Sequence, residues 1–163
     1  MIVIADTSPL NYLVLIGQEN LLPKFFGQVI IPQAVFDELN DAGASVEVRN
    51  WLREIPNWIE IKQIGLASNA SLDIWDTGER EAILLAQELS ADLLLVDDKQ
   101  ARQAAVDFGI AITGILGILD RAAQKDLLDL SETLDKLQKT SFRASEKLIS
   151  NLIQLDAERK LKD

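Results

Sequence analysis

The chain has 163 residues and carries 16 lysines and arginines against 26 aspartates and glutamates, a formal net charge of −10 at pH 7. Its 48% hydrophobic and 26% charged residues are typical of a globular domain that buries a core, which excludes a chain disordered throughout. The absence of cysteine and histidine excludes disulfides, Cys–His and Ser–His–Asp catalysis, and thiolate or imidazole metal sites. Any acid, base or metal ligand must therefore be mainly a carboxylate.

The sequence contains no segment typical of a membrane protein. The N-terminal apolar run breaks at Asp6, too early for a secretory signal, and no apolar stretch approaches the roughly 20 residues that cross a bilayer. We therefore expect a cytoplasmic protein without a membrane partner. The acidic balance by itself disfavours nonspecific attraction to nucleic acid.

Short apolar runs alternate with helical patterns along most of the chain. Strands are predicted at 2–5, 29–31, 58–62, 93–96 and 110–112. Helices are predicted at 7–16, 21–26, 33–39, 45–55, 77–90, 99–108 and 115–124. Because short apolar strands separated by helices form parallel sheets covered on both faces, the pattern predicts an α/β fold, a three-layer α/β/α sandwich.

The last part of the chain differs in character. Residues 131–139 and 145–160 are predicted helices, and the second places Leu148, Leu152 and Leu155 along one side. We expect one domain over residues 1–163, in which residues 127–163 form a helical extension packed on the rest. The alternative is that this last helix contacts a partner or a second copy.

Acidic side chains follow the predicted strands at the points where ligands bind in open parallel sheets. Asp6 follows the first strand, and Asp97 and Asp98 follow the strand at 93–96. Glu79, at the start of the preceding helix, and Glu38, near the end of helix 33–39, can reach the same edge. A hard divalent cation with oxygen ligands, Mg²⁺ or Mn²⁺, would neutralise such a cluster and could activate a bound water.

Each residue taken alone also fits a structural role. Asp6 suits the N-cap of the first helix, and Glu79 suits a capping box opened by Asp76. Asp97 and Asp98 suit a turn that opens the next helix. The common placement of the acids, and not any one of them, indicates a site.

Several short motifs in a fixed order resemble those of the PIN-domain family. They are Asp6-Thr7-Ser8-Pro9-Leu10, Val35-Phe36-Asp37-Glu38-Leu39, Gly78-Glu79-Arg80-Glu81-Ala82-Ile83 and Leu95-Val96-Asp97-Asp98. The chain also resembles a subgroup of small prokaryotic members of this family that carry two further elements. Here these are Gly114-Ile115-Leu116-Gly117 and Phe142-Arg143-Ala144-Ser145. The resemblance covers nearly the whole chain.

The resemblance implies an α/β/α fold and a metal-dependent endoribonuclease of the VapC-toxin type. RNA would be the substrate, a small antitoxin protein the partner, and a homodimer a further expectation. Thr7 and Ser8 would orient Asp6 or contact a phosphate. The implied ligands of Mg²⁺ or Mn²⁺ are Asp6, Glu38, Glu79 and either Asp97 or Asp98.

The third acid of the usual toxin pattern has two candidates here, Glu79 and Glu81. Glu79 lies one turn before Ile83, whose side chain should face the sheet, whereas Glu81 is rotated by about 200° from Glu79. We therefore favour Glu79 and keep Glu81 as the second choice. Lys99 and Arg102, which begin the next helix, are the expected RNA contacts, although solvated helix charge explains them equally simply.

Two other functions are consistent with the same residues. A PIN-like protein without catalytic activity could retain the fold for protein contacts, which would suit the net charge of −10. A different carboxylate–metal enzyme, such as a phosphatase or a flap-type DNA nuclease, could use the same acids.

Overall fold

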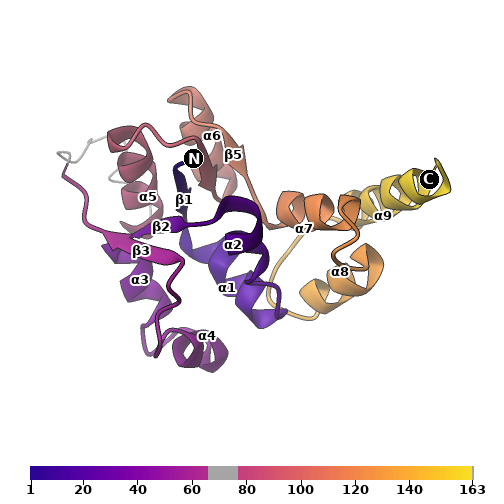
Figure 1. The fold of residues 1–163 in the computed structure, drawn as a ribbon, viewed down its shortest axis with the longest axis horizontal. Helices are drawn as coiled ribbons and strands as arrows, with labels where there is room; N and C mark the ends of the chain where they lie inside the picture. Colours follow the sequence, from indigo (N-terminus) through magenta and orange to yellow (C-terminus); the bar gives the residue numbers. More distant parts are fainter. Residues whose placement is uncertain (66–76, 163) are drawn as a thin grey trace. The chain divides into compact units, whose positions relative to one another are not determined.

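The computed structural model describes residues 1–65 and 77–162 (Figure 1). The chain divides into two compact units, Met1–Gly114 and Ile115–Asp163, which we call the N-terminal and the C-terminal unit. The predicted boundary of the helical extension, residue 127, thus lies inside the second unit. That residues 127–163 pack on the rest of the chain stays a prediction.

A parallel five-stranded sheet forms the centre of the described N-terminal unit, in the order β3-β2-β1-β4-β5. Ile4 of β1 pairs with Ile30 of β2 on one side and with Leu94 of β4 on the other. The central position of β1 explains why its three residues are fully buried. The strands are β1 (Val3–Ala5), β2 (Val29–Pro32), β3 (Ile59–Lys62), β4 (Leu93–Leu95) and β5 (Ile112–Thr113).

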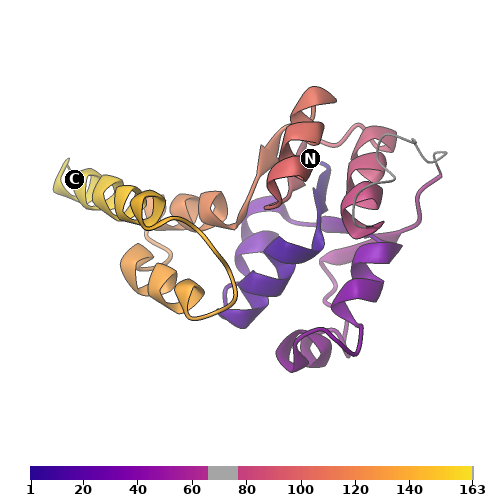
Figure 2. The ribbon, with the colours of Figure 1, turned by 180° about the vertical axis from the view of Figure 1, so that it is seen from behind.

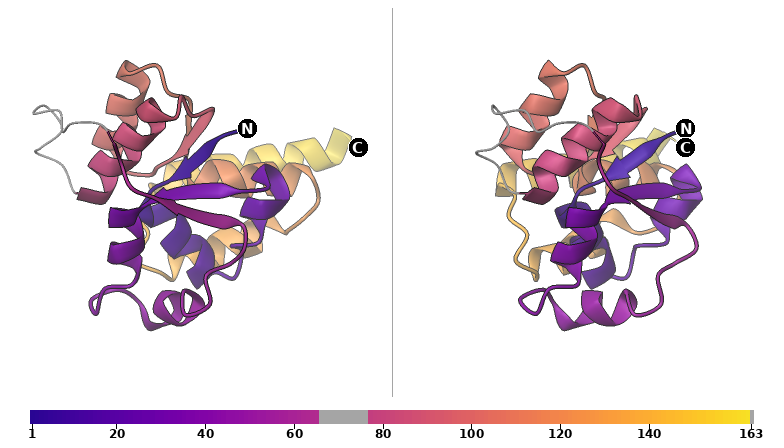
Figure 3. Two further views of the ribbon diagram at one scale, coloured as in Figure 1. Left: turned by 60° about the vertical axis from the view of Figure 1, so that its left-hand side comes forward. Right: turned by 90° about the vertical axis from the view of Figure 1, so that its left-hand side faces the viewer.

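Helices cover both faces of this sheet, as the short, wholly apolar strands require. Figure 3 shows α5 and α6 on one side of the sheet and α1 on the other. Ile4, Ile30 and Leu94 belong to the same buried cluster as the apolar residues of α5 and α6. The helices are α1 (Thr7–Leu15), α2 (Leu21–Phe26), α3 (Gln33–Leu39), α4 (Val46–Trp51), α5 (Thr77–Glu88) and α6 (Lys99–Asp107).

The last strand begins later than the predicted range of 110–112. Gly109 follows α6 with a φ of 76°, and the Ile110 amide donates to the carbonyl of Ala105 at 2.9 Å. This is the hydrogen-bond pattern of a Schellman motif, so Ile110 still belongs to the helix end. Strand pairing therefore starts only at Ile112.

The helix predicted over 45–55 ends at Trp51, four residues early. Ile55, which we expected on its apolar face, is 45% exposed. Pro56 explains part of this difference, because a proline disfavours helical backbone at the residue before it. The other predicted strands and helices of both units are present, with ends that differ from the predicted ones by at most two residues.

The C-terminal unit consists, in its described residues, of α7 (Ile115–Gln124), α8 (Leu130–Gln138) and α9 (Glu146–Lys162) (Figure 2). The prediction for the apolar side of α9 is wrong for two of its three leucines, because Leu148 and Leu155 are 45% and 52% exposed, whereas Leu152 is partly buried. Ile149 and Asp156 are buried instead, one residue further along in each case. The helix is therefore rotated by about 100° from the predicted orientation.

The Phe-Arg-x-Ser segment precedes α9. The Ser145 hydroxyl oxygen accepts from the Leu148 amide at 3.1 Å, and the Arg143 guanidinium donates to the carbonyl of Thr140 at 3.3 Å. The segment thus caps the start of the last helix. Within residues 1–65 and 77–162, every helix is too short or too polar to cross a bilayer.

Candidate active site

The two central strands bring Asp6 and Asp97 to one edge of the sheet. Ala5 pairs with Leu95 in register, and the Asp6 amide continues the ladder by donating to the carbonyl of Leu95 at 2.9 Å. Asp6 directly follows β1, and Asp97 lies two residues beyond the end of β4. This is the carboxyl edge of the parallel strands, where the sequence placed the site.

Asp6 occupies the N-cap position of α1 but makes no side-chain capping hydrogen bond. The interpretation of this residue as an ordinary helix cap is therefore wrong. Its side chain is also among the few buried charged ones in the described residues, with 3% exposure. A buried carboxylate at this position is costly unless other groups stabilise it, and the positive end of α1 is one of them.

The adjacent acids after β4 have different surroundings. Asp98 caps α6, since its Oδ1 accepts from the Ala101 amide at 2.9 Å. Asp97 is partly buried, and its Oδ1 lies against Gly114, at the end of β5. The geometry thus favours Asp97 over Asp98 as the candidate ligand.

Glu38 is anchored by groups from two other segments. The Thr7 hydroxyl donates to its Oε2 at 2.6 Å, and the Gly78 amide donates to its Oε1 at 2.9 Å. Thr7 directly follows Asp6, so the contact links α3 to the end of β1. Gly78 lies in the first turn of α5, directly before Glu79, so the same carboxylate also links α3 to α5.

The two candidate ligands of α5, Glu79 and Glu81, also have different surroundings. Glu81 accepts from the Ala34 amide at 3.3 Å and so satisfies a donor in the first turn of α3. Glu79 is partly buried and directly follows the residue that anchors Glu38. This arrangement supports Glu79 over Glu81. Asp76, the expected start of the capping box, lies outside the described residues.

The remaining predicted residues lie on the first turns of two helices. Thr7 and Ser8 are partly buried at the start of α1, and Thr7 contacts Glu38 where the resemblance implied a contact with Asp6 or a phosphate. Lys99 and Arg102 are exposed at the start of α6. That they contact RNA stays a prediction.

The donor set at this edge is all-oxygen, which fits Mg²⁺ or Mn²⁺ by chemistry. In the part of the chain that the structure describes, no three acidic side chains lie close enough together to hold an ion as they stand. Glu38 and Asp98 instead contact protein hydrogen-bond donors. A bound cation would require some of these side chains to change their conformations.

Sequence reasoning did not identify the role of Gly78 as a hydrogen-bond donor. The signal available was its position directly before Glu79 at the start of a helix, where amide groups lack intrahelical partners. Such an amide can donate to a carboxylate from any neighbouring segment, so only the structure could identify Glu38 as its partner.

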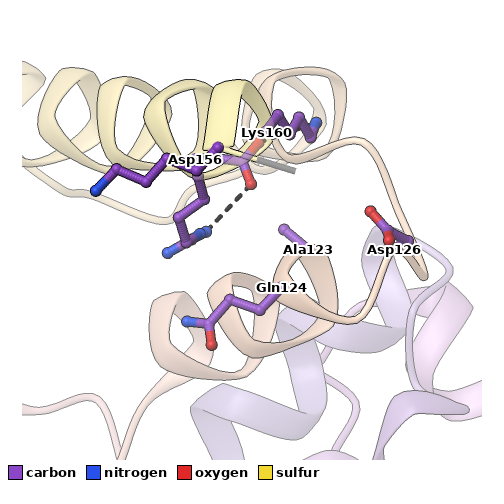
Figure 4. Close-up of a pocket in the computed structure, with 7 residues that line it drawn as sticks. Ala123, Gln124, Asp126, Asp156 and Lys160 are labelled. Atoms are coloured by element: carbon purple, nitrogen blue, oxygen red, sulfur yellow. Dashed lines mark hydrogen bonds and ion pairs between the residues drawn. The ribbon is translucent and has the colours of Figure 1, made fainter.

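A cavity of about 340 Å³ lies within the C-terminal unit, apart from all these predicted residues (Figure 4). Arg159 donates to Asp120 at 2.9 Å and to Asp156 at 3.1 Å, and Lys160 pairs with Asp156 at 3.1 Å. The hydrogen bond to Asp120 raises the pKa of Arg159, and that to Asp156 raises the pKa of Lys160. The Arg159–Asp120 pair joins α9 to α7, whereas both pairs of Asp156 lie within α9. The cavity is lined by Ala123, Gln124, Asp126, Asp156, Arg159, Lys160 and Lys162.

Comparison with known proteins defines the class of protein. A model of the DUF3368 family, described as a PIN domain, matches residues 2–158. The chain therefore belongs to the PIN-domain family, a family of metal-dependent nucleases. Comparison with curated proteins gave no match.

A solved structure supports the same fold. The chain is similar to a PilT N-terminus domain protein, SSO1118, from the hyperthermophilic archaeon Sulfolobus solfataricus P2, with a TM-score of 0.53 and 14% identity. The match covers 89% of this chain and 100% of the archaeal chain. The predicted PIN-like α/β/α fold is thus confirmed.

Proposed function

We propose that this PIN domain is a metal-dependent endoribonuclease and the toxin of a toxin–antitoxin pair. The observation that carries the proposal is the placement of Asp6 and Asp97 at one sheet edge, with Glu38 hydrogen-bonded to the residue beside Asp6. Asp6 and Asp97 follow paired strands, and Glu38 is hydrogen-bonded to the residue after Asp6. A nuclease without histidine needs such carboxylates, because they are the side chains that can hold a hard cation.

Asp6, Glu38, Glu79 and Asp97 would hold Mg²⁺ or Mn²⁺, which supplies an activated water and stabilises charge that develops on a phosphate. Thr7 keeps the Glu38 carboxylate oriented toward the end of β1. Asp98 keeps the start of α6 in place.

A nucleic-acid substrate is supported by two exposed cations, and RNA in particular by the resemblance to toxins of this family. Lys99 and Arg102 lie in the first turns of α6, directly after the acidic pair. Phosphate contacts at this position would draw the backbone of a nucleic acid toward the acids despite the net charge of −10. A small antitoxin, a homodimer and a cytoplasmic location complete the proposal and rest on the resemblance to toxins of this family.

The test is cleavage of a labelled RNA of mixed sequence, beside single-stranded and duplex DNA of the same sequence. We expect cleavage of RNA with Mg²⁺ or Mn²⁺, none in excess chelator, and a loss of at least a hundredfold in Asp6→Asn. Full activity in chelator would overturn the metal-dependent mechanism. Cleavage of DNA alone would identify a DNA nuclease, and no cleavage of any substrate would favour the noncatalytic interaction module.

Glu81→Gln is the matched control for this experiment. Its carboxylate contacts the Ala34 amide, and a glutamine oxygen can accept the same hydrogen bond. We expect this variant to cleave RNA at close to the wild-type rate, although it removes one negative charge from the same unit as Asp6→Asn does.

A further inference from the structure

Two glycines of the N-terminal unit lie against candidate metal ligands. A Cβ atom at Gly78 would stand 2.6 Å from Glu38 Oε1 and 2.8 Å from Oε2. A Cβ atom at Gly114 would overlap Asp97 Oδ1 and stand 3.2 Å from the carbonyl oxygen of Val96. Cβ contacts under 3.0 Å essentially never occur, so an alanine at either position would displace the carboxylate, which is the movable end of its side chain.

Space, and not backbone conformation, explains these two glycines. Gly109 shows the opposite case, with a φ of 76° and nothing within 4 Å of the place that a Cβ atom would take. Gly78 and Gly114 have ordinary φ values that other residues adopt readily. At Gly78 helix propensity alone would favour alanine, because this residue lies inside α5.

We propose that Gly78 and Gly114 are positioning residues that leave room for the Glu38 and Asp97 carboxylates at the acidic edge, from which these side chains would reach a cation. The inference rests on the proposed function, since it assigns a purpose to the positions of two proposed ligands. At Gly78 the missing side chain lets the amide approach Glu38 to 2.9 Å, while Thr7 holds the other oxygen at 2.6 Å. At Gly114 the missing side chain admits Asp97 beside the end of β5.

The chain contains a matched control for this arrangement. The Gly65 amide donates to Glu88 Oε2 at 2.9 Å, and a Cβ there would stand 2.6 Å from Glu88 Oε1. The shortest Cβ distance is the same as at Gly78, but the oxygen that accepts the amide would lie 3.9 Å from the Cβ, and Glu88 is exposed at the end of α5 and can turn into solvent. Gly65→Ala should therefore displace a carboxylate at no cost to the site.

The first measurement is Mn²⁺ affinity by calorimetry on the full chain. We expect Gly78→Ala and Gly114→Ala each to weaken binding about tenfold to a hundredfold, as the loss of groups that orient metal ligands does. Gly65→Ala should bind as the wild type does. In Gly78→Ala, shortening the ligand by one methylene with Glu38→Asp should recover part of the affinity, because it reopens the space.

The second measurement needs no metal. In chelator, Gly78→Ala should lower the melting temperature of the wild type, whereas the same change should leave unchanged or raise that of Glu38→Ala. Such non-additivity identifies direct contact between the two residues. Equal effects of Gly78→Ala in both backgrounds, or wild-type Mn²⁺ affinity in both glycine variants, would overturn the positioning role.

The outcomes separate this inference from the proposed function. Mn²⁺ binding that is lost in Asp6→Asn but kept in both glycine variants would leave the nuclease proposal intact and remove the glycines from it. A wild-type chain that binds no Mn²⁺ would overturn the metal site itself, and the melting experiment would still decide whether Gly78 and Glu38 are coupled.

Discussion

Asp6→Asn should remove most of the rise in melting temperature that a divalent cation causes. Asp6 is 3% exposed and has no side-chain capping hydrogen bond to lose. Asparagine has nearly the same volume and removes one charge from the acidic edge. Because burying a carboxylate costs more desolvation than burying an amide, and we expect this difference to exceed the lost attraction to the positive end of α1, the variant should melt at or above the wild-type temperature in chelator.

The effect of the cation can be estimated by linkage. A ligand that binds only the native state stabilises it by about 2.7 kcal/mol at a hundredfold excess over Kd. For a chain of this size, 1 kcal/mol shifts the melting temperature by about 2–4 °C, so the wild type should gain about 5–11 °C. Asp6→Asn should lose most of that gain, because one ligand is replaced by a weaker neutral oxygen.

The assay is thermal unfolding followed by circular dichroism, in chelator and in millimolar Mn²⁺. Asp98→Asn is the control, because Asp98 caps α6 and asparagine caps helices about as well as aspartate. That variant should keep the full Mn²⁺ shift. Identical shifts in the wild type and Asp6→Asn would remove Asp6 from the site, and no shift in any of the three proteins would refute the reasoning.

Three further outcomes are expected. Glu79→Gln should lower the initial rate of RNA cleavage far more than Glu81→Gln, and the reverse order would transfer the ligand role to Glu81. Replacing Lys99 and Arg102 together by alanine should weaken binding of single-stranded RNA in a low-salt titration and reduce the salt slope by roughly 1.4; unchanged affinity would identify them as solvated helix charges. Asp156→Ala should cost about 1–2 kcal/mol in urea unfolding, because its side chain is 8% exposed but its cationic partners can reach solvent. An unchanged midpoint would show that these ion pairs within α9 do not stabilise the protein.

Most strands and helices and their order could be predicted from the sequence, because the residue patterns that indicate them are local. Apolar runs such as 93–96 and helix starts such as Lys99 depend on neighbouring residues alone. The late start of β5 could not be predicted, because Ile110 fits a strand equally well and its amide bonds back to α6 only in the folded chain. The buried side of α9 was predicted wrongly for a related reason. An ion-paired Asp156 lies on its buried side, whereas a pattern based on hydropathy places aspartate outside.

The candidate site could likewise be predicted only in part from the sequence. The strand ends indicated Asp6 and the Asp97–Asp98 pair, because parallel strands share one carboxyl edge. The choice between Asp97 and Asp98 required coordinates, since consecutive residues in a turn point in directions that depend on the turn itself. The anchoring of Glu38 by Gly78 involves residues 40 positions apart, a relation that one sequence does not contain.

The topology that gathers the acids at one edge also supplies part of their stabilisation. In a parallel sheet the helices that follow the strands begin at the carboxyl edge, so their free amide groups and positive dipole ends lie there. Three carboxylates use such amides: Asp98 accepts from Ala101 of α6, Glu81 from Ala34 of α3, and Glu38 from Gly78 of α5. A chain with a net charge of −10 and no histidine can therefore concentrate acids at this edge without relying on a cation for each of them. Glu38 then differs from the two structural acids through its second bond, because the Thr7 hydroxyl directs it to the end of β1, where Asp6 stands.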